Sequence, residues 1–204
     1  YILASFENLM IYFMQNKNNL IIEKNDSVEK LQRWFFEMII GQLKYSINFV
    51  QHNYANEIFQ TMAKILRTSV DCNALVDFDI YSNKLKEFFD FSASQGKIVF
   101  SAKVIDLYKE LIIYVFDKEK EDDWLPKIRD NMKFFSFNTS EIYSDEELLK
   151  KVYELYYLFL EKIVDKKDLD LYQRVSDELF DFVNRSFPNV NNTAIKYLKI
   201  YNVI

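Results

Sequence analysis

The side chains that most often do chemistry in proteins are scarce in this sequence. Its 204 residues include one histidine, His52, and one cysteine, Cys72. Around His52, neither a glutamate nor a second histidine stands at the spacing of a di-iron or zinc-protease motif on a helix. We therefore interpret His52 as an ordinary residue near a helix end and predict no metal site.

Cys72 is a poor candidate for a nucleophile. It follows Asp71, whose negative charge disfavours the thiolate form of the side chain. Nucleophilic catalysis would also need a base, and His52 belongs to a different predicted helix. We predict a buried structural thiol, and a lone cysteine favours a reducing compartment, so the predicted location is cytoplasmic.

Acidic residues gather in two runs, residues 119–123 and 145–147. Paired carboxylates can act as acid and base or bind hard cations, but the calcium-loop pattern with its glycine is absent. Each run precedes a predicted helix, where negative charge stabilises the first turn by about 0.3–1 kcal/mol. An enzyme that uses carboxylates alone is therefore the function class that we rank lowest.

Phosphate ligands have no recognisable site either. Gly96 and Lys97 resemble half of a P-loop, but Phe91 stands in place of its first glycine and Ile98 in place of its Ser or Thr. The net charge is −5, with 26 basic residues interspersed among 31 acidic ones, which argues against a nucleic-acid partner. The sequence thus predicts no enzyme, no cofactor and no nucleic-acid binding.

The elements that must position any site are predicted to be helices. Two glycines and two prolines in 204 residues leave few turns and few helix breakers. Apolar periodicity predicts helices over residues 2–16, 26–53, 55–70, 81–95, 98–116, 124–137, 144–164 and 171–187, and a short one from about 192. We expect Pro126 to stand in the first turn of its helix with Asp123 as the cap, Ser144 to cap the next one, and Gly96 to end the fourth.

These elements predict one all-α domain over residues 1–204. The fold class is an irregular multi-helix bundle of about nine helices; an α-solenoid-like stack of helical hairpins is the alternative, because no residue signature recurs at a fixed period. The sequence begins with Tyr1 rather than Met, so we expect it to be a segment of a longer protein.

The helix over residues 26–53 has two apolar stripes and is predicted to be covered on both sides. One stripe contains Leu31, Phe35, Met38, Tyr45 and Phe49, and the other contains Phe36, Ile40, Leu43, Ile47, Val50 and Tyr54. Gly41 lies in the middle of this helix, where a glycine costs about 1 kcal/mol relative to alanine. A close helix crossing or a kink would explain its presence.

With catalysis disfavoured, surface contacts remain. Phe134, Phe135 and Phe137 lie together at the end of a predicted helix, and we hypothesise that they contribute to a partner or dimer interface. The alternative is that this segment folds back under the bundle.

The function that we predict is a non-enzymatic helical interaction or regulatory domain. Its partner would be another protein or a second copy, and it would contact a membrane only through segments outside this chain. The alternative is a ligand-binding helical domain, which predicts a closed, aromatic-lined cavity of several hundred Å³.

Overall fold

A computed structural model describes residues 2–15, 26–48, 52–71, 77–117, 121–143 and 145–186. All elements in these ranges are helical: α1 (Ile2–Gln15), α2 (Asp26–Asn48), α3 (His52–Asp71), α4 (Phe78–Ser94), α5 (Ile98–Asp117), α6 (Glu121–Phe137), the π-helical η1 (Asn138–Tyr143), α7 (Glu146–Lys166) and α8 (Leu169–Ser186). The predicted all-α multi-helix bundle is confirmed. The short helix predicted from about residue 192 lies outside the described ranges.

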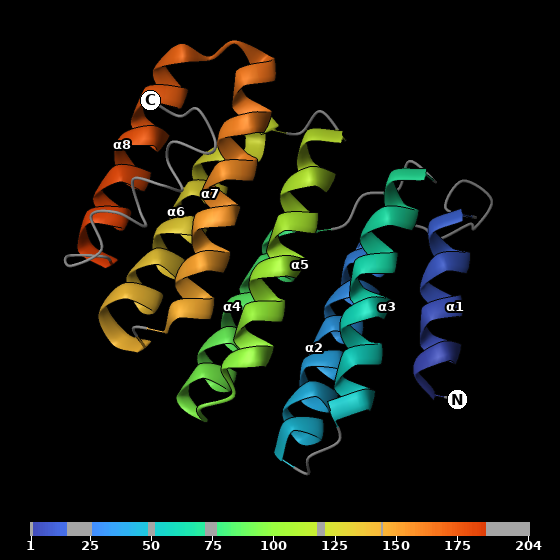
Figure 1. Ribbon diagram of the computed structural model, residues 1–204. Helices are drawn as coiled ribbons and strands as arrows, with labels where there is room; N and C mark the ends of the chain where they lie inside the picture. The colour runs from blue at the N-terminus through green and yellow to red at the C-terminus, as the bar shows by residue number, and fades with distance from the viewer. Residues whose placement is uncertain are drawn as a thin grey trace. The chain divides into compact units, whose positions relative to one another are not determined.

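The chain divides into two compact units, Tyr1–Asn131 and Met132–Ile204. In the first, α2 with α3 and α4 with α5 form two helical hairpins, and α2 packs on α4 while α3 packs on α5 (Figure 1). Helix α1 lies against α3. Within the first unit, the two hairpins are therefore stacked, as in the α-solenoid-like alternative. The prediction of a single domain stays a prediction.

The second unit is built on the hairpin of α7 and α8, and both helices contact η1. Tyr156 of α7 stacks on Phe182 of α8, with ring centroids 6.1 Å apart and planes 19° from parallel. An ion pair between Lys133 and Glu178, 3.3 Å long, links the end of α6 to α8.

Aromatic side chains fill the core of the first unit. Phe36 is fully buried and meets the ring of Tyr81 edge to face, with centroids 4.7 Å apart. Phe59 lies close to both Phe88 of α4 and Phe100 of α5. These phenylalanines therefore connect helices of both hairpins. Large apolar side chains make such contacts when the apolar stripe of a helix is buried.

Aspartates begin three of the helices. Asp77 accepts a hydrogen bond from the amide of Ile80 at the start of α4, and Asp168 accepts one from Leu171 at the start of α8. Asp145 caps α7, which corrects the predicted cap at Ser144 by one residue. One oxygen of the Asp145 carboxylate accepts hydrogen bonds from two amides of the first turn.

Gly96 ends α4 as predicted. Its φ of 67° is left-handed, and its amide donates to the carbonyl of Ala93. Lys97 donates in turn to the carbonyl of Ser92, which completes a Schellman-type cap.

The expectation that Pro126 stands in the first turn of its helix, with Asp123 as the cap, is wrong. Helix α6 already begins at Glu121, so both residues lie inside it, and Pro126 is exposed. The added turn carries Trp124, whose ring stacks on Phe78 at 5.3 Å and on Tyr114 at 6.3 Å. Stacking of this large, partly buried ring offsets the one helical hydrogen bond that a proline cannot donate.

The expectation that both stripes of α2 are covered holds only in part. Phe36, Ile40 and Leu43 of the second stripe are buried. In the first stripe Phe35 is fully buried, but Tyr45 is 50% exposed. Met38 is only partly buried. A Cβ added at Gly41 would meet no atom within 4 Å, so no close helix crossing in the described part of the chain explains this glycine.

Lys44 and Lys84 both bind Glu87, across 2.6 and 2.9 Å, and join α2 to α4. The hydrogen bond from Lys44, followed by that from Lys84, lowers the pKa of Glu87 below its ordinary 4.5. A lowered pKa stabilises the fold above the ordinary value and loses that stabilisation as the pH falls through the lowered one.

We expect Glu87→Gln to lower the unfolding midpoint slightly at pH 7, and we expect its difference from the unaltered chain to shrink as the pH falls through the lowered pKa of the native carboxylate. The carboxylate is largely exposed, so the effect at neutral pH stays under about 1 kcal/mol. Thermal melts of both proteins from pH 7 to pH 3 measure it. A difference between them that grows toward pH 3 would contradict the assignment.

Candidate interaction surfaces

The three phenylalanines singled out in the sequence have unequal surroundings. Phe135 is fully buried, Phe134 is partly buried and packs edge to face against it at 5.4 Å, and Phe137 is 53% exposed. The structure therefore divides the predicted cluster. Of the three, Phe137 offers the largest fraction of its side chain to a partner.

Phe137 is the last α-helical residue before the π-helical turn η1. The sequence predicts that the polar residues 138–140 end the helix, but the chain continues through them as a π-helix. Thr139 donates to the carbonyl of Phe135, and Asn138 donates to that of Phe134, each at 2.8 Å. These side chains donate to backbone carbonyls of the preceding turn, where the helical pitch changes. Such π-helical turns recur at functional sites.

Other large apolar side chains are exposed on several helices. Among the residues that the structure describes, those at least 40% exposed, besides Phe137, are Leu9, Tyr12, Trp34, Tyr45, Val99, Val164, Leu169 and Phe180. Sequence reasoning did not single out Trp34. The signal that could have found it is the four-three-four spacing of Trp34, Met38, Gly41 and Tyr45 along α2.

Two hollows lie between helices of the first unit, and both are open to solvent. One of about 330 Å³ lies between α3 and α5 and includes Phe59, Lys103 and Glu110 in its lining. The other, of about 360 Å³, lies between α1 and α3. Charged side chains line both, so neither is the closed aromatic cavity that a ligand-binding domain predicts. That alternative function remains a prediction.

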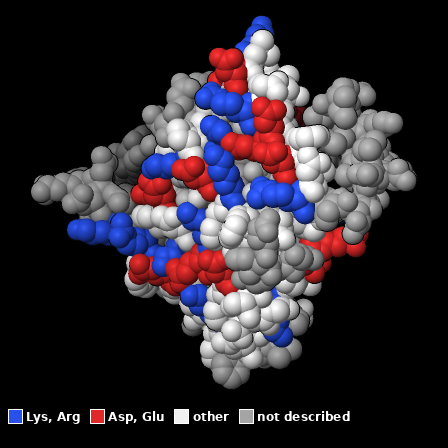
Figure 2. All heavy atoms as spheres, turned by 90° about the vertical axis from the view of Figure 1, so that its left-hand side faces the viewer, with Lys and Arg blue, Asp and Glu red and all other residues white. Residues whose placement is uncertain are grey.

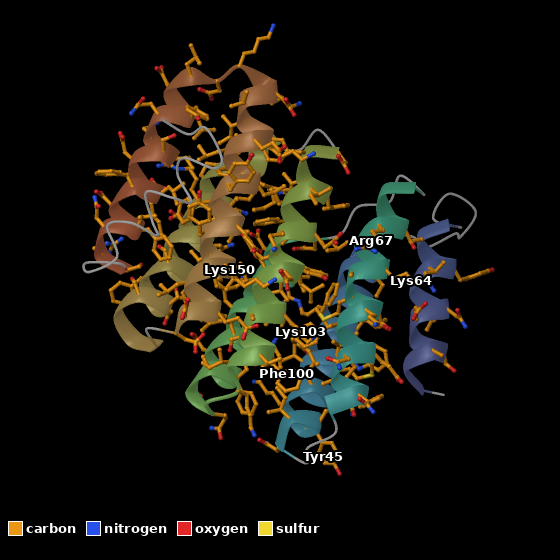
Figure 3. The ribbon with its side chains drawn as sticks, viewed as in Figure 1. Tyr45, Lys64, Arg67, Phe100, Lys103 and Lys150 are labelled. Carbon is orange, nitrogen blue, oxygen red and sulfur yellow. The ribbon has the colours of Figure 1, made fainter. Side chains whose placement is uncertain are left out.

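Polar groups at the rims of these hollows already have partners in the protein. Arg67 forms a two-pronged ion pair with Glu110, with its Nε 3.1 Å from the carboxylate, and Lys64 pairs with Glu7. Figure 3 shows Arg67 and Lys64 on α3 and Lys103 on α5. Exposed pairs of this kind join neighbouring helices at modest energetic gain.

The buried tyrosines of this unit are structural groups. Burial raises the pKa of both Tyr81 and Tyr108 above the ordinary 10, so both stay protonated. The Tyr81 hydroxyl donates to the carbonyl of Met62 at 3.2 Å, and the amide of Asn131 donates to the Tyr108 hydroxyl at 2.8 Å. Neither residue can act as a base at neutral pH.

The residues considered for catalysis fall largely outside the described part of the chain. This holds for Cys72, for the His52 side chain and for residues 118–120. Within the described ranges, no group of three or more His, Cys, Asp or Glu residues is arranged to hold a metal ion. The acidic run at residues 145–147 begins α7, and Asp145 serves there as the cap.

Charges of both signs are mixed on the surface that Figure 2 presents. Lysines and arginines lie among aspartates and glutamates, and neither sign covers that face alone. Among the residues whose placement is described, no helix is both long and apolar enough to cross a membrane.

Comparison with protein-family models, with curated proteins and with solved structures found no match to this chain.

Proposed function

We propose that this chain is a non-enzymatic helical interaction domain that binds another protein or a second copy of itself through exposed aromatic side chains. Phe137 carries the proposal: it is 53% exposed, although Phe135 beside it is buried. Aromatic side chains contribute much of the energy of protein interfaces and are costly to leave in water.

The hydrogen bonds around Phe137 support the same proposal. Side chains of η1 donate to the backbone on both sides of it, as Ser140 does to the carbonyl of Ser136 across 2.8 Å. A side chain presented on ordered backbone loses little conformational freedom when a partner binds it. The single cysteine supports a reducing compartment such as the cytoplasm, and membrane contact, where it occurs, would be made by segments outside this chain.

Replacing Phe137 with glutamine tests the proposal. Since the ring is more than half exposed, we expect the free energy of unfolding to change by less than about 1 kcal/mol. In cells that make the protein, a photo-reactive phenylalanine analogue at position 137 should form discrete cross-linked species. The glutamine variant should compete for the same partner far more weakly than the unaltered chain.

Lys150 provides the control position, since it is exposed on α7 of the same unit (Figure 3). The analogue placed there should give no discrete species. Equal cross-linking at positions 137 and 150, or none at 137, would count against Phe137 as a contact residue.

A further inference from the structure

The outward side of α2 carries an unusual row of side chains. Trp34 and Tyr45 are 49% and 50% exposed, Met38 is partly exposed, and Gly41 lies between them. At 100° per residue these four positions fall within about 60° of arc on the helix. The buried residues of α2, which face α3 and α4, occupy the opposite side. We call this row the α2 seam.

Gly41 is the feature of the seam that the described part of a single chain does not explain. Alanine would form a better helix at this position, and its Cβ would meet nothing within 4 Å. Gly41 has an ordinary helical conformation, since the only glycine with positive φ among the described residues is Gly96. A glycine on an exposed helix face does allow another backbone to approach closely.

We propose that the α2 seam pairs with the same seam of a second copy, with the two α2 helices antiparallel and Gly41 at the closest approach. The proposal rests on the proposed interaction function and names the partner. Four-three-four spacing is the pattern by which one helix packs its side chains into another. Helix α2 has 23 residues and is about 35 Å long, enough for several layers of such packing.

The seam is complementary to itself in size. In the antiparallel arrangement that places Met38 opposite Gly41 of the second copy, Trp34 lies opposite Tyr45 of the second copy. A long side chain thus meets the space left by a glycine, and two aromatic rings meet each other. Two-fold symmetry makes each contact occur twice.

The seam is also complementary to itself in charge. Glu37 and Lys44 lie on the same flank of the seam, seven residues apart. Antiparallel pairing brings Glu37 beside Lys44 of the second copy, whereas parallel pairing would bring it beside the uncharged Gln42. Lys44 already binds Glu87 at 2.6 Å, and its three ammonium hydrogens allow a second carboxylate.

Figure 3 shows Tyr45 at the outer edge of the first unit, near the end of α2 that leads to α3. One helix on each side buries less area than a standard protein interface, so we expect a dissociation constant on the order of 10 µM.

Sedimentation equilibrium of the purified chain from about 1 to 300 µM tests the pairing. We expect a monomer–dimer equilibrium for the unaltered chain. Gly41→Ala should raise the unfolding midpoint of the dilute chain, because alanine favours the helix, and yet raise the dissociation constant at least tenfold. A change in helix stability alone would not weaken dimerisation. A more stable monomer that dimerises less well therefore indicates pairing at the α2 seam.

Asn83→Ala is the matched control, an exposed position on α4 where alanine also favours the helix. It should leave the dissociation constant unchanged. In a Cys72→Ser background, a mixture of Glu37→Cys and Lys44→Cys chains should form a mixed disulfide on oxidation, as antiparallel pairing requires.

A chain that is monomeric throughout, or a Gly41→Ala variant that dimerises as well as the unaltered chain, overturns the α2 pairing. Disulfides that form only between identical variants overturn its antiparallel orientation. None of these results affects cross-linking at Phe137 in the other unit, so the interaction function can stand when the α2 pairing fails. A chain that neither dimerises nor cross-links from position 137 would contradict both the α2 pairing and the interaction function.

Discussion

Phe36→Ala is expected to lower the free energy of unfolding of the first unit by about 3–5 kcal/mol. The ring of Phe36 is fully buried in α2 and packs edge to face on Tyr81 of α4. Its removal loses the transfer free energy of the ring and leaves a cavity between the two stacked hairpins. Thermal and urea unfolding at low protein concentration measure the effect, which should appear as a fall in midpoint on the order of 10 °C.

The control for this variant is Trp34→Ala, two residues away on the same helix. Trp34 is larger than Phe36 but 49% exposed, so its removal should cost much less when the chain is dilute. Equal losses for the two variants would mean that α2 does not present these faces as the structure has them.

Phe182→Ala is expected to destabilise the second unit by a similar amount, about 3–5 kcal/mol. Phe182 is fully buried in α8 and stacks on Tyr156 of α7, across the only long hairpin of that unit in the described ranges. Unfolding monitored by circular dichroism measures the loss. Phe180→Ala is the control, because Phe180 is 57% exposed on the same helix and its removal should cost under about 1 kcal/mol.

Together the two core variants test whether the chain unfolds as one domain. If residues 1–204 form a single cooperative domain, Phe36→Ala and Phe182→Ala lower the same transition. If the two compact units unfold separately, each variant lowers one of two transitions and leaves the other in place. Calorimetry of the three proteins distinguishes these results, and the second would contradict the prediction of a single domain.

The sequence by itself determined that this protein is helical and where most helices lie. Apolar side chains at helical spacing cannot be buried on one side of a strand, so stripes such as that of Phe36, Ile40 and Leu43 define an element and its buried face together. Gly96 ends α4 because a left-handed conformation costs glycine less than any other residue. These are local properties of the backbone and of neighbouring side chains, and they need no knowledge of the fold.

Only the tertiary structure decided which apolar side chains remain exposed. Phe135 and Phe137 are the same residue type two positions apart, yet one is buried and the other is 53% exposed. Trp124 extends α6 ahead of Pro126 because Phe78 and Tyr114 from other helices receive its ring. In the described ranges, the face of α2 around Gly41 is open because α3 and α4 pack on its other side. Burial depends on which helices come together, and the spacing of residues along one helix does not contain that information.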